Sequence, residues 1–326
     1  MCFVWYGKGW SDLKFLSVGE MVIDFLPGEE DGVYIRMPGG APANVAIALA
    51  RHGCEAAFCG MMGNDSFGRF LLKILTDNRV TPLVTELTDI ATTTMAFVTL
   101  SEDGNRSFTF ARKPGADMFL NKKHLNHPWF DEADFVHAGS CSLSKGDARE
   151  ATIYALEESH RRGKIVSFDI NYRDLLWDGN RAAAIRSIMG ILPNVDLLKI
   201  SDEEAEMVGG EAALPNLMSD NNIALIVETL GAKGARYYWN DKILFLPGLK
   251  AKCVDTTGAG DAFWGGFLST LLKAGVCTSA DFTEDLLTTA LRCGNISGWL
   301  CVQKKGAIES LPTAAEVQRY WKELYL

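Results

Sequence analysis

Short apolar runs with strand character alternate with longer helical stretches over most of this 326-residue chain. The runs that predict strands are residues 14–18, 56–60, 134–137, 164–169, 195–200 and 223–229. Stretches with helical periodicity lie between most of them, at residues 42–52, 67–78, 147–162, 181–191 and 202–208. Because a helix between two strands allows both to run the same way, we expect an α/β fold whose mostly parallel sheet is flanked by helices on both faces.

Two regions, about residues 21–37 and 92–112, break this alternation with short runs of strand-like residues. The second is split by the hairpin turn signal Glu102–Asn105. Antiparallel strands outside the main sheet predict a small β lid over the site. We expect one α/β domain over residues 11–326 with this lid inserted in it. Residues 1–10 lack a basic start and a small-residue cleavage site, so they are interpreted as an extension and not as a signal peptide.

Composition excludes several classes of partner. The chain is 48% hydrophobic and 22% charged, which suits a globular core, and its net charge of −9 disfavours nucleic acid and anionic membrane surfaces. No segment approaches the roughly 18 apolar residues of a membrane helix. The eight cysteines form no Cys-x-x-Cys and no cluster with the five histidines, so we expect free thiols and a cytoplasmic location.

The stretch Asp255–Asp261 reads Asp-Thr-Thr-Gly-Ala-Gly-Asp. It follows a strand-like run at residues 250–254 and precedes an apolar helical pattern at residues 262–272. Glycines before a helix let backbone N–H groups point at a ligand where the helix dipole already favours negative charge. This pattern predicts a phosphate site. A carboxylate beside bound phosphate, Asp261, suits a group that takes the proton of a phosphoryl acceptor.

Two other interpretations fit parts of this stretch. A glycine turn with a capping Asp is common and needs no ligand. Gly258-x-Gly260 also begins a dinucleotide fingerprint, but Phe263 occupies the place of its third small residue. Asp281 lies near the distance expected of a ribose ligand, although residues 270–280 are typical of a helix end and loop. No Gly-x-x-x-x-Gly-Lys-Ser/Thr occurs, which excludes the P-loop ATPases.

As a whole, the seven-residue string resembles the C-terminal signature of the ribokinase-like (PfkB) family of carbohydrate kinases. Residues 39–44, continued by residues 60–68, are similar to the family's N-terminal signature. The resemblance extends over about residues 13–320 and is strongest to bacterial fructokinases. It implies a ribokinase-like three-layer fold, with Asp261 as the catalytic base and an anion hole made by the N–H groups of Gly258, Ala259 and Gly260.

The resemblance also implies a set of sugar ligands: Asp24, Gly39, Gly40, Asn44, Arg112, Asn171 and Arg173. The segment Asp169–Arg173 is similar to the Asp-Pro-Asn-x-Arg of fructokinases, with Ile170 in place of Pro. A structural ion pair explains Arg112 and Arg173 equally well. An exposed turn explains Asp24, and a plain glycine turn explains residues 39–40.

The nucleotide contacts implied in the same way are Lys199, Ser201, Thr229, Gly231, Gly234 and Asn295. Where the family has Asn-x-x-Glu, with the Glu ordering Mg²⁺ through water, this chain has Ser201 and Glu204. These two residues also form a capping box, which explains both without any chemistry. A monovalent cation, K⁺, near Asp255 and Thr257 is implied by the resemblance alone.

The function implied is Mg²⁺-dependent transfer of the ATP γ-phosphoryl group to a sugar hydroxyl, with the 6-hydroxyl of fructose as first choice. Such transfer depends mainly on positioning and charge stabilisation. One alternative is a kinase for another acceptor, such as 2-keto-3-deoxygluconate, ribose or a nucleoside. Another is a non-catalytic relative that binds sugar or nucleotide. The resemblance further implies a homodimer formed through the β lid.

Overall fold

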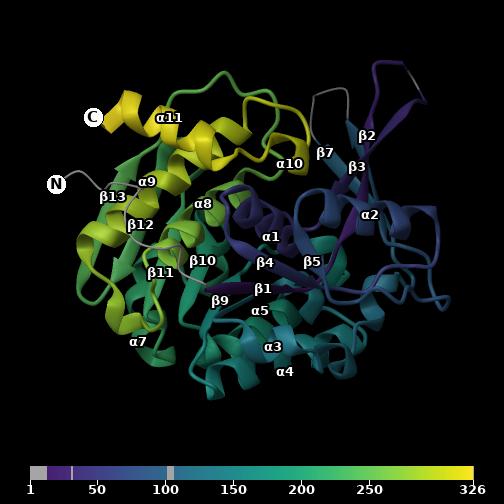
Figure 1. The fold of residues 1–326 in the computed structure, drawn as a ribbon, viewed down its shortest axis with the longest axis horizontal. Helices are drawn as coiled ribbons and strands as arrows, with labels where there is room; N and C mark the ends of the chain where they lie inside the picture. Colours follow the sequence, from purple (N-terminus) through teal and green to yellow (C-terminus); the bar gives the residue numbers. More distant parts are fainter. Residues whose placement is uncertain (1–12, 31, 101–105, 326) are drawn as a thin grey trace.

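A computed structural model describes residues 13–30, 32–100 and 106–325 (Figure 1). The expected extension at residues 1–10 and the turn signal at Glu102–Asn105 lie outside these residues. The centre of the fold is a nine-stranded sheet in the order β13-β12-β11-β10-β9-β8-β1-β4-β5. Its strands are β1 Lys14–Val18, β4 Glu55–Cys59, β5 Val80–Pro82, β8 Phe135–Gly139, β9 Ile165–Asp169, β10 Leu197–Ser201, β11 Leu225–Thr229, β12 Gly234–Trp239 and β13 Lys242–Pro247.

The seven strands from β11 to β5 pair in parallel, which confirms the mostly parallel sheet. β8 and β9 are buried along their whole length, as expected of central strands that are covered on both faces. β12 and β13 pair antiparallel at one edge and were not predicted. The turn between them contains Asn240 in the left-handed conformation, with φ 52°, a hairpin signal that the sequence does carry.

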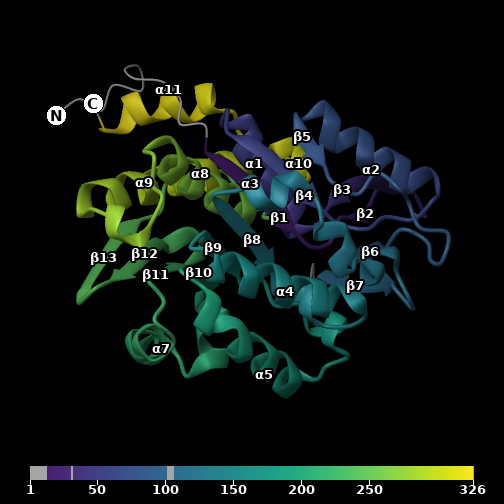
Figure 2. The ribbon, with the colours of Figure 1, turned by 60° about the horizontal axis from the view of Figure 1, so that its bottom comes forward.

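Helices cover both faces of this sheet (Figure 2). Those that pack on one face are α1 Ala41–Arg51, α2 Ser66–Asp77, α8 Ala259–Lys273 and α9 Glu284–Cys301. Those on the other face are α3 Pro128–Glu132, α4 Asp147–Arg161, α5 Arg181–Ile191 and α7 Leu214–Asn221. Short helices α6 Asp202–Ala205 and α10 Ala307–Ser310 follow β10 and α9. The three-layer arrangement predicted for the domain is therefore confirmed.

Helix α8 is enclosed over most of its length. Its residues 262–272 are all buried, in keeping with their apolar character on every side. Two glycines let neighbouring helices approach closely. A Cβ on Gly265 would lie 2.3 Å from the Cβ of Ala48 in α1, and one on Gly266 would lie 2.3 Å from the Oγ of Ser297 in α9. The position of α8 is therefore fixed by two helices as well as by the sheet.

A separate four-stranded sheet in the order β3-β2-β6-β7 forms the lid. Its strands are β2 Val22–Pro27, β3 Tyr34–Gly39, β6 Met95–Leu100 and β7 Arg106–Ala111. It extends from the body on the side of α2 and β5 (Figure 1). The second sheet expected from residues 21–37 and 92–112 is thus present.

One strand prediction was wrong. Residues 250–254 form no strand; the segment is irregular and ends where the N–H groups of Val254 and Asp255 both donate to the carbonyl of Val302, at 2.7 and 3.2 Å. The glycine turn before α8 is therefore tied to the end of α9 and not to a strand. Residues 250–254, Lys-Ala-Lys-Cys-Val, alternate polar and apolar side chains as an edge strand does, and only tertiary contacts distinguish the two.

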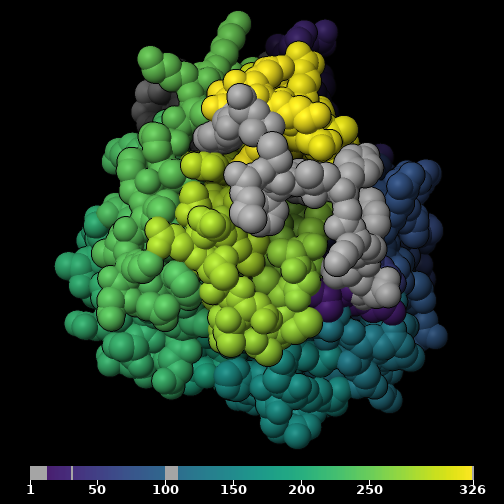
Figure 3. Space-filling view, turned by 60° about the vertical axis from the view of Figure 1, so that its left-hand side comes forward, coloured from purple at the N-terminus to yellow at the C-terminus, as the bar shows by residue number. Residues whose placement is uncertain are grey.

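The C-terminal helix α11, Ala314–Tyr325, packs across α9 at one end of the molecule (Figure 3). Val317 is buried there with Ile296, and the Trp299 and Tyr320 rings meet edge to face at 4.8 Å. Among the described residues, none of the helices combines the length and the apolar character needed to cross a membrane.

Candidate active site

The site lies at the carboxyl ends of the parallel strands, where open α/β sheets generally place ligands. The first turn of α8 is its centre. Gly258 caps the helix with φ 78°, and a Cβ there would lie 2.9 Å from the Cα of Ala307. Glycine is therefore required both by conformation and by space. The Ala259 N–H donates to the carbonyl of Thr256 at 3.2 Å, so of the three predicted anion-hole amides this one has an internal partner.

Asp261 and Asn44 join the two signature stretches. The Nδ2 of Asn44, in α1, donates to Oδ2 of Asp261 at 2.7 Å, although the two residues are 217 positions apart. Burial raises the pKa of Asp261, and the Asn44 hydrogen bond opposes that shift. A carboxylate with a raised pKa that is held by an amide is suited to accept a proton.

The part of the site predicted to hold the sugar, called the acceptor end below, lies where the lid meets the loop before α1. A Cβ on Gly39 would lie 2.2 Å from Oδ2 of Asp24, and one on Gly40, where φ is 112°, would lie 2.6 Å from the carbonyl oxygen of Glu20. Burial raises the pKa of Asp24 to about 6, and the nearby charge of Arg173 partly offsets this. The structure thus brings Asp24, Gly39 and Gly40 together.

The two arginines differ in their surroundings. The guanidinium of Arg112 contacts the buried carboxylate of Asp117 at 2.7 Å and Oγ of Ser144 at 3.1 Å, so it is part of a structural ion pair. Arg173 is exposed, and its guanidinium donates to the carbonyl of Tyr172 at 3.0 Å. Its side chain therefore remains the more available of the two for a ligand. The side chain of Arg106, the other arginine beside the lid hairpin, lies outside the described part.

Asn171 follows β9 with φ 39°, a left-handed conformation that is uncommon for residues other than glycine. It turns the chain so that Arg173 returns toward Asp24 and Asp261, whose carboxylates interact electrostatically with the guanidinium. The carbonyl of Asn171 accepts a weak hydrogen bond from Sγ of Cys141 at 3.6 Å. The segment after β9 is thus bent toward the acceptor end.

Glu20 is a residue of this site that sequence reasoning missed. It follows Gly19 at the end of β1, is only 6% exposed, and its Oε2 has no hydrogen-bond partner among the described residues. Burial raises its pKa to about 7, and the charges of Asp117 and Asp261 add to this. The sequence did carry one signal for Glu20: it comes directly after a predicted buried strand, at the edge of the sheet where ligands bind.

Lys199 lies behind the predicted anion hole. Its Nζ donates to Oδ2 of Asp169 at 2.8 Å, and both side chains are almost fully buried. A Cβ on Gly260 would lie 3.3 Å from the same Nζ, so the ammonium is in contact with the first turn of α8. Burial works against the charge of Lys199, but the neighbouring carboxylates outweigh it and the net pKa is raised. A permanent positive charge therefore adds to the helix dipole.

Ser201 and Glu204 form the predicted capping box at the start of α6. Oε2 of Glu204 accepts from the Ser201 N–H at 2.9 Å, and Oε1 accepts from the Tyr172 N–H at 2.7 Å. Each oxygen keeps a lone pair. Burial raises the pKa of Glu204, and the charge of Asp169 adds to the shift. The other oxygen of Asp169, Oδ1, is buried and has no hydrogen-bond partner within the described residues.

These oxygens suit a hard cation such as Mg²⁺, which prefers carboxylate and water ligands. In the part of the chain that the structure describes, no group of three or more His, Cys, Asp or Glu side chains could enclose a metal. Mg²⁺ would therefore take most of its ligands from water and nucleotide phosphates. The residues present fit this mode of binding.

The carboxylate of Asp255 orders the turn before α8. Oδ1 accepts from the N–H and the hydroxyl of Thr257, at 3.0 and 2.7 Å, and Oδ2 accepts from the buried N–H of Gly306 at 3.0 Å. These hydrogen bonds account for the carboxylate by themselves. The predicted K⁺ site at this turn remains a prediction.

The remaining predicted nucleotide residues lie at the edge formed by β11, β12 and α9. Thr229 ends β11, and Gly231 and Gly234 both have positive φ, 57° and 118°. A Cβ on Gly234 would lie 2.1 Å from the carbonyl oxygen of Leu246, so the turn packs tightly against β13. Asn295 of α9 is buried, and its Nδ2 lies 3.4 Å from the carbonyl of Pro247 at the end of that strand.

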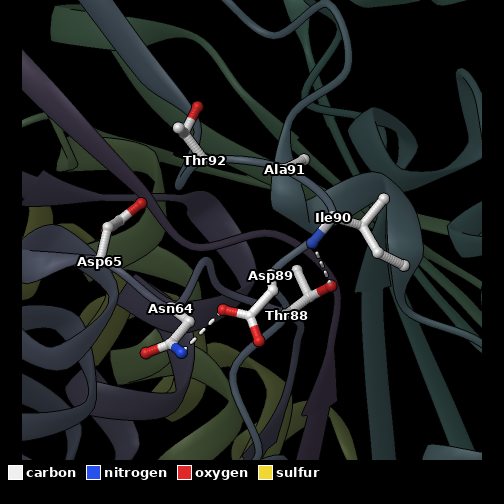
Figure 4. A pocket seen from close by; sticks show the side chains of 7 residues that line it. All are labelled: Asn64, Asp65, Thr88, Asp89, Ile90, Ala91 and Thr92. Atoms are coloured by element: carbon white, nitrogen blue, oxygen red, sulfur yellow. Dashed lines mark hydrogen bonds between the residues drawn. The ribbon is translucent and has the colours of Figure 1, made fainter.

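A small open pocket lies apart from these residues, at the base of the lid (Figure 4). It contains the continuation of the N-terminal signature, and its polar groups bind one another. Nδ2 of Asn64 donates to Asp89 at 2.8 Å, and Oδ1 of Asp65 accepts from two N–H groups at the start of α2. Asp65 also accepts from the N–H of Thr93, at the start of the lid's second arm. We interpret this pocket as a joint between body and lid.

Comparison with known proteins shows the family to which the chain belongs. Residues 12–314 match the model of the pfkB family of carbohydrate kinases. The chain therefore belongs to this family, and its enzymes are phosphotransferases with a sugar hydroxyl as acceptor.

Among individual relatives, a probable fructokinase-5 of Arabidopsis thaliana is 40% identical over 319 residues, which are 94% of this chain and 97% of that protein. Fructokinase-1 of Zea mays is 40% identical over 312 residues, 93% of this chain and 95% of the relative. Sequence similarity thus covers nearly the whole length on both sides.

Solved structures of carbohydrate kinases are similar to this chain in fold. A fructokinase double mutant of Vibrio cholerae O395, bound to fructose, ADP and potassium, has a TM-score of 0.86 at 33% identity over 96% of this chain and 99% of that one. A fructokinase of Xylella fastidiosa with bound ATP has a TM-score of 0.84 at 30% identity, over 96% and 99%. An aminoimidazole riboside kinase of Salmonella enterica has a TM-score of 0.81 at 30% identity, over 94% and 99%. The ribokinase-like fold expected from the sequence is confirmed.

Proposed function

We propose that this protein is an ATP-dependent fructokinase that phosphorylates the 6-hydroxyl of fructose. The observation that carries the proposal is the Asn44–Asp261 hydrogen bond at the N-terminus of α8, which joins a predicted sugar ligand to the predicted base in the first turn of that helix. Similarity to fructokinases over more than nine-tenths of the chain supports fructose as the acceptor.

Fructose would be held between the lid and the body. Asp24 would accept hydrogen bonds from its hydroxyl groups, and the glycine loop at residues 39–40 would let the sugar approach the backbone. Asn171 and Arg173 would approach from the end of β9. Arg112 would support this wall through its ion pair with Asp117 and would contact the sugar little. Several convergent polar groups of this kind orient a polyol for transfer.

Asp261 would then accept the proton of the 6-hydroxyl as its oxygen attacks the γ-phosphorus. Asn44 would hold the carboxylate in place, and the raised pKa of Asp261 would favour transfer of the proton to it. The N–H groups of Gly258 and Gly260, with Lys199 beside them, would stabilise the charge on the transferred group, and the Ala259 N–H would join them by sharing its hydrogen with the carbonyl of Thr256.

At the nucleotide end, Glu204 and Asp169 would hold Mg²⁺ through water, and the ion would neutralise phosphate charge. Ser201 would contact the phosphates through its hydroxyl proton, because its oxygen accepts from the Glu204 N–H and its own N–H donates to Oε2 of Glu204. Thr229, Gly231 and Gly234 would line the phosphates, and Asn295 the adenine. K⁺ near Asp255 and Thr257 belongs to the same proposal, since the similar Vibrio enzyme was solved with potassium.

The direct test is Asp261→Asn. Loss of the general base should lower kcat by about 10²- to 10⁴-fold, while calorimetric affinity for fructose stays within about threefold of the wild type. Asp281→Asn, beyond the far end of α8, is the matched control and should turn over normally. Near-normal kcat in Asp261→Asn would sink the assignment of the base.

The acceptor is tested by ADP release with ATP and Mg²⁺ across fructose, ribose, glucose, 2-keto-3-deoxygluconate and an aminoimidazole riboside. We expect the highest kcat/KM for fructose. The riboside is included because a kinase for it has the same fold. A higher kcat/KM for any other acceptor would replace fructose in the proposal, and nucleotide binding without turnover would favour a non-catalytic relative.

The proposal has two further parts. The protein would form a homodimer through the β lid, whose strand β3 exposes the apolar side chains of Tyr34 and Ile35. It would act in the cytoplasm, since the seven cysteines of the described residues are all free thiols.

A further inference from the structure

The face of β9 that is turned toward α8 carries two polar side chains in an otherwise apolar interface. Ser167 and Asp169 are two residues apart on the strand and therefore point to the same side of the sheet. The indole Nε1 of Trp264 in α8 donates to Oγ of Ser167 at 3.0 Å. Asp169 accepts from Lys199 at 2.8 Å, and Lys199 contacts α8 at Gly260. The strand is thus linked to the helix at two points, directly through Ser167 and indirectly through Lys199 of β10.

The spacing of these two points is matched. Two residues of a strand span roughly 6.6 Å, and the four residues from Gly260 to Trp264 rise about 6 Å along a helix. Residues four apart also lie on the same face of the helix. A pair of contacts at this spacing fixes both the height and the rotation of the first turn of α8, which carries Asp261.

The Ser167 hydroxyl is satisfied on both sides. Nδ1 of His137, directly opposite on β8, lies 2.9 Å from Oγ of Ser167. Burial lowers the pKa of His137 to about 4, so its ring is neutral near pH 7. Because an indole N–H can only donate, the hydroxyl accepts from Trp264 and can donate to His137. All three side chains have zero exposure, and such a buried, directional chain permits one arrangement only.

We propose that Ser167 and Trp264 are positioning residues for phosphoryl transfer. Their hydrogen bond holds α8 at the height and rotation at which Asp261 meets the acceptor hydroxyl and the Gly258–Gly260 amides meet the phosphate. Trp264 lies one turn after Asp261, so a small rotation of the helix moves the carboxylate directly. The catalytic part of this inference rests on the proposed function, whereas the structural part does not.

The chain offers a matched control on the same helix. Oγ of Ser269 lies 2.9 Å from Nδ1 of His52 in α1, and this pair is also fully buried. Ser269 is eight residues beyond Asp261, so the loss of its hydroxyl removes an equivalent hydrogen bond at the far half of α8. If both serines served stability alone, neither change should lower kcat.

The first experiment compares Ser167→Ala with Ser269→Ala. Both should lower the melting temperature, Ser167→Ala by more, because it leaves two buried ring nitrogens without a partner and Ser269→Ala leaves one. Only Ser167→Ala should lower kcat, by about tenfold, with KM for ATP and for the sugar within twofold, since a displaced base costs rate more than binding. Equal effects of the two variants on kcat, or none in either, would overturn the proposal.

The second experiment separates positioning from stability. Ser167→Ala with Trp264→Phe leaves no indole N–H without a partner, so the melting temperature should fall by less than the sum of the two single changes, although the smaller ring leaves a cavity. We expect kcat to stay low in the double variant because the hydrogen bond between Ser167 and Trp264, the tether of α8 to β9, is still absent. A kcat that recovers in the double variant would show that the hydrogen bond serves folding only.

A third readout does not depend on the acceptor. Hydrogen–deuterium exchange of the backbone amides at residues 258–264 should be faster in Ser167→Ala than in the wild type, and unchanged in Ser269→Ala. If the wild type fails to phosphorylate any sugar while this difference is present, the proposed function falls and the tether stands. If fructose is phosphorylated and the difference is absent, the tether falls alone.

Discussion

Two carboxylates at the acceptor end, Glu20 and Asp24, are held where ionisation is unfavourable. Burial raises the pKa of Glu20 to about 7 and that of Asp24 to about 6. Both face Asp261, so ionisation of any one of the three makes ionisation of the others harder. We therefore expect the pH–rate profile of the enzyme to report the group of carboxylates and not Asp261 alone.

Glu20 gives a prediction on stability. An unfolded Glu has an ordinary pKa near 4.5, so between about pH 4.5 and 7 the unfolded chain loses a proton that the folded chain keeps. The folded state is therefore destabilised as pH rises through this window, and the full cost is present above pH 7. Glu20→Gln removes this cost. Glu20→Gln should therefore raise the free energy of unfolding above that of the wild type, and this gain should be about 2 kcal/mol larger at pH 8 than at pH 5.

Urea unfolding of both proteins at the two pH values checks this. Glu157→Gln, on the exposed side of α4, is the control and should give the same difference at both pH values. The idea fails if Glu20→Gln behaves like the control. The charges that face Glu20 from other segments, Asp117, Arg112 and Asp261, remain in place in the variant.

At the same scale, the sequence predicted site residues that belong to contiguous motifs. Asp261, Asn44 and Gly258 could be found because their roles require a fixed local spacing. The partner of Arg112 could not, because Asp117 pairs with it only after β7 and the following turn have formed. The Ser167–Trp264 hydrogen bond joins residues 97 positions apart and has no motif at either end.

At the scale of elements, the two ends of α8 show what the site requires of its glycines. Gly258 at the N-terminus and Gly275 after the C-terminus have nearly the same φ, 78° and 77°. A Cβ on Gly258 would lie 2.9 Å from Ala307, whereas one on Gly275 would meet nothing within 4 Å. Conformational strain is therefore common to both positions, and steric conflict is confined to the site.

We predict that Gly258→Ala and Gly275→Ala each lose about 1 to 2 kcal/mol of stability, the cost of a left-handed non-glycine residue. Gly258→Ala should lose more, and it should also lower kcat/KM for ATP by at least about tenfold, because the turn must move away from Ala307. Gly275→Ala should keep wild-type kinetics. Denaturant unfolding and steady-state kinetics of both variants test this, and normal ATP kinetics in Gly258→Ala would contradict it.

Element boundaries followed from sequence wherever local signals were complete. β1 and α5 have the predicted bounds, and the Ser201–Glu204 capping box forms as expected. The strand predicted at residues 250–254 is absent because this alternating segment is anchored by two hydrogen bonds to Val302 and not by a neighbouring strand. β12 and β13 were missed because they run antiparallel at the edge of a sheet that the helical alternation describes only in its parallel part.

At the scale of the whole molecule, apolar side chains are exposed on strands at two opposite places. On the lid, Tyr34 and Ile35 of β3 are 42% and 40% exposed and, as neighbours in one strand, lie on opposite faces of its sheet. On the main sheet, Ile243 and Phe245 of the edge strand β13 are 59% and 50% exposed. Exposed apolar strand surface favours association, and either place could serve a second copy of the chain. The lid is the place that matters for the site, because Asp24 lies in β2 next to β3.

The homodimer through the lid can therefore be tested with a charge at each place. Ile35→Lys should convert the dimer to a monomer in sedimentation equilibrium, because an ammonium group at the centre of an apolar contact must be desolvated. Ile243→Lys, the matched change on β13, should leave the dimer intact. Dissociation by Ile243→Lys alone would move the interface to the edge of the main sheet, and a wild type with the mass of one chain would rule the dimer out. If the lid surface is the interface, Ile35→Lys should also raise KM for fructose several-fold, since β2 and its Asp24 would lose the support of the partner's lid.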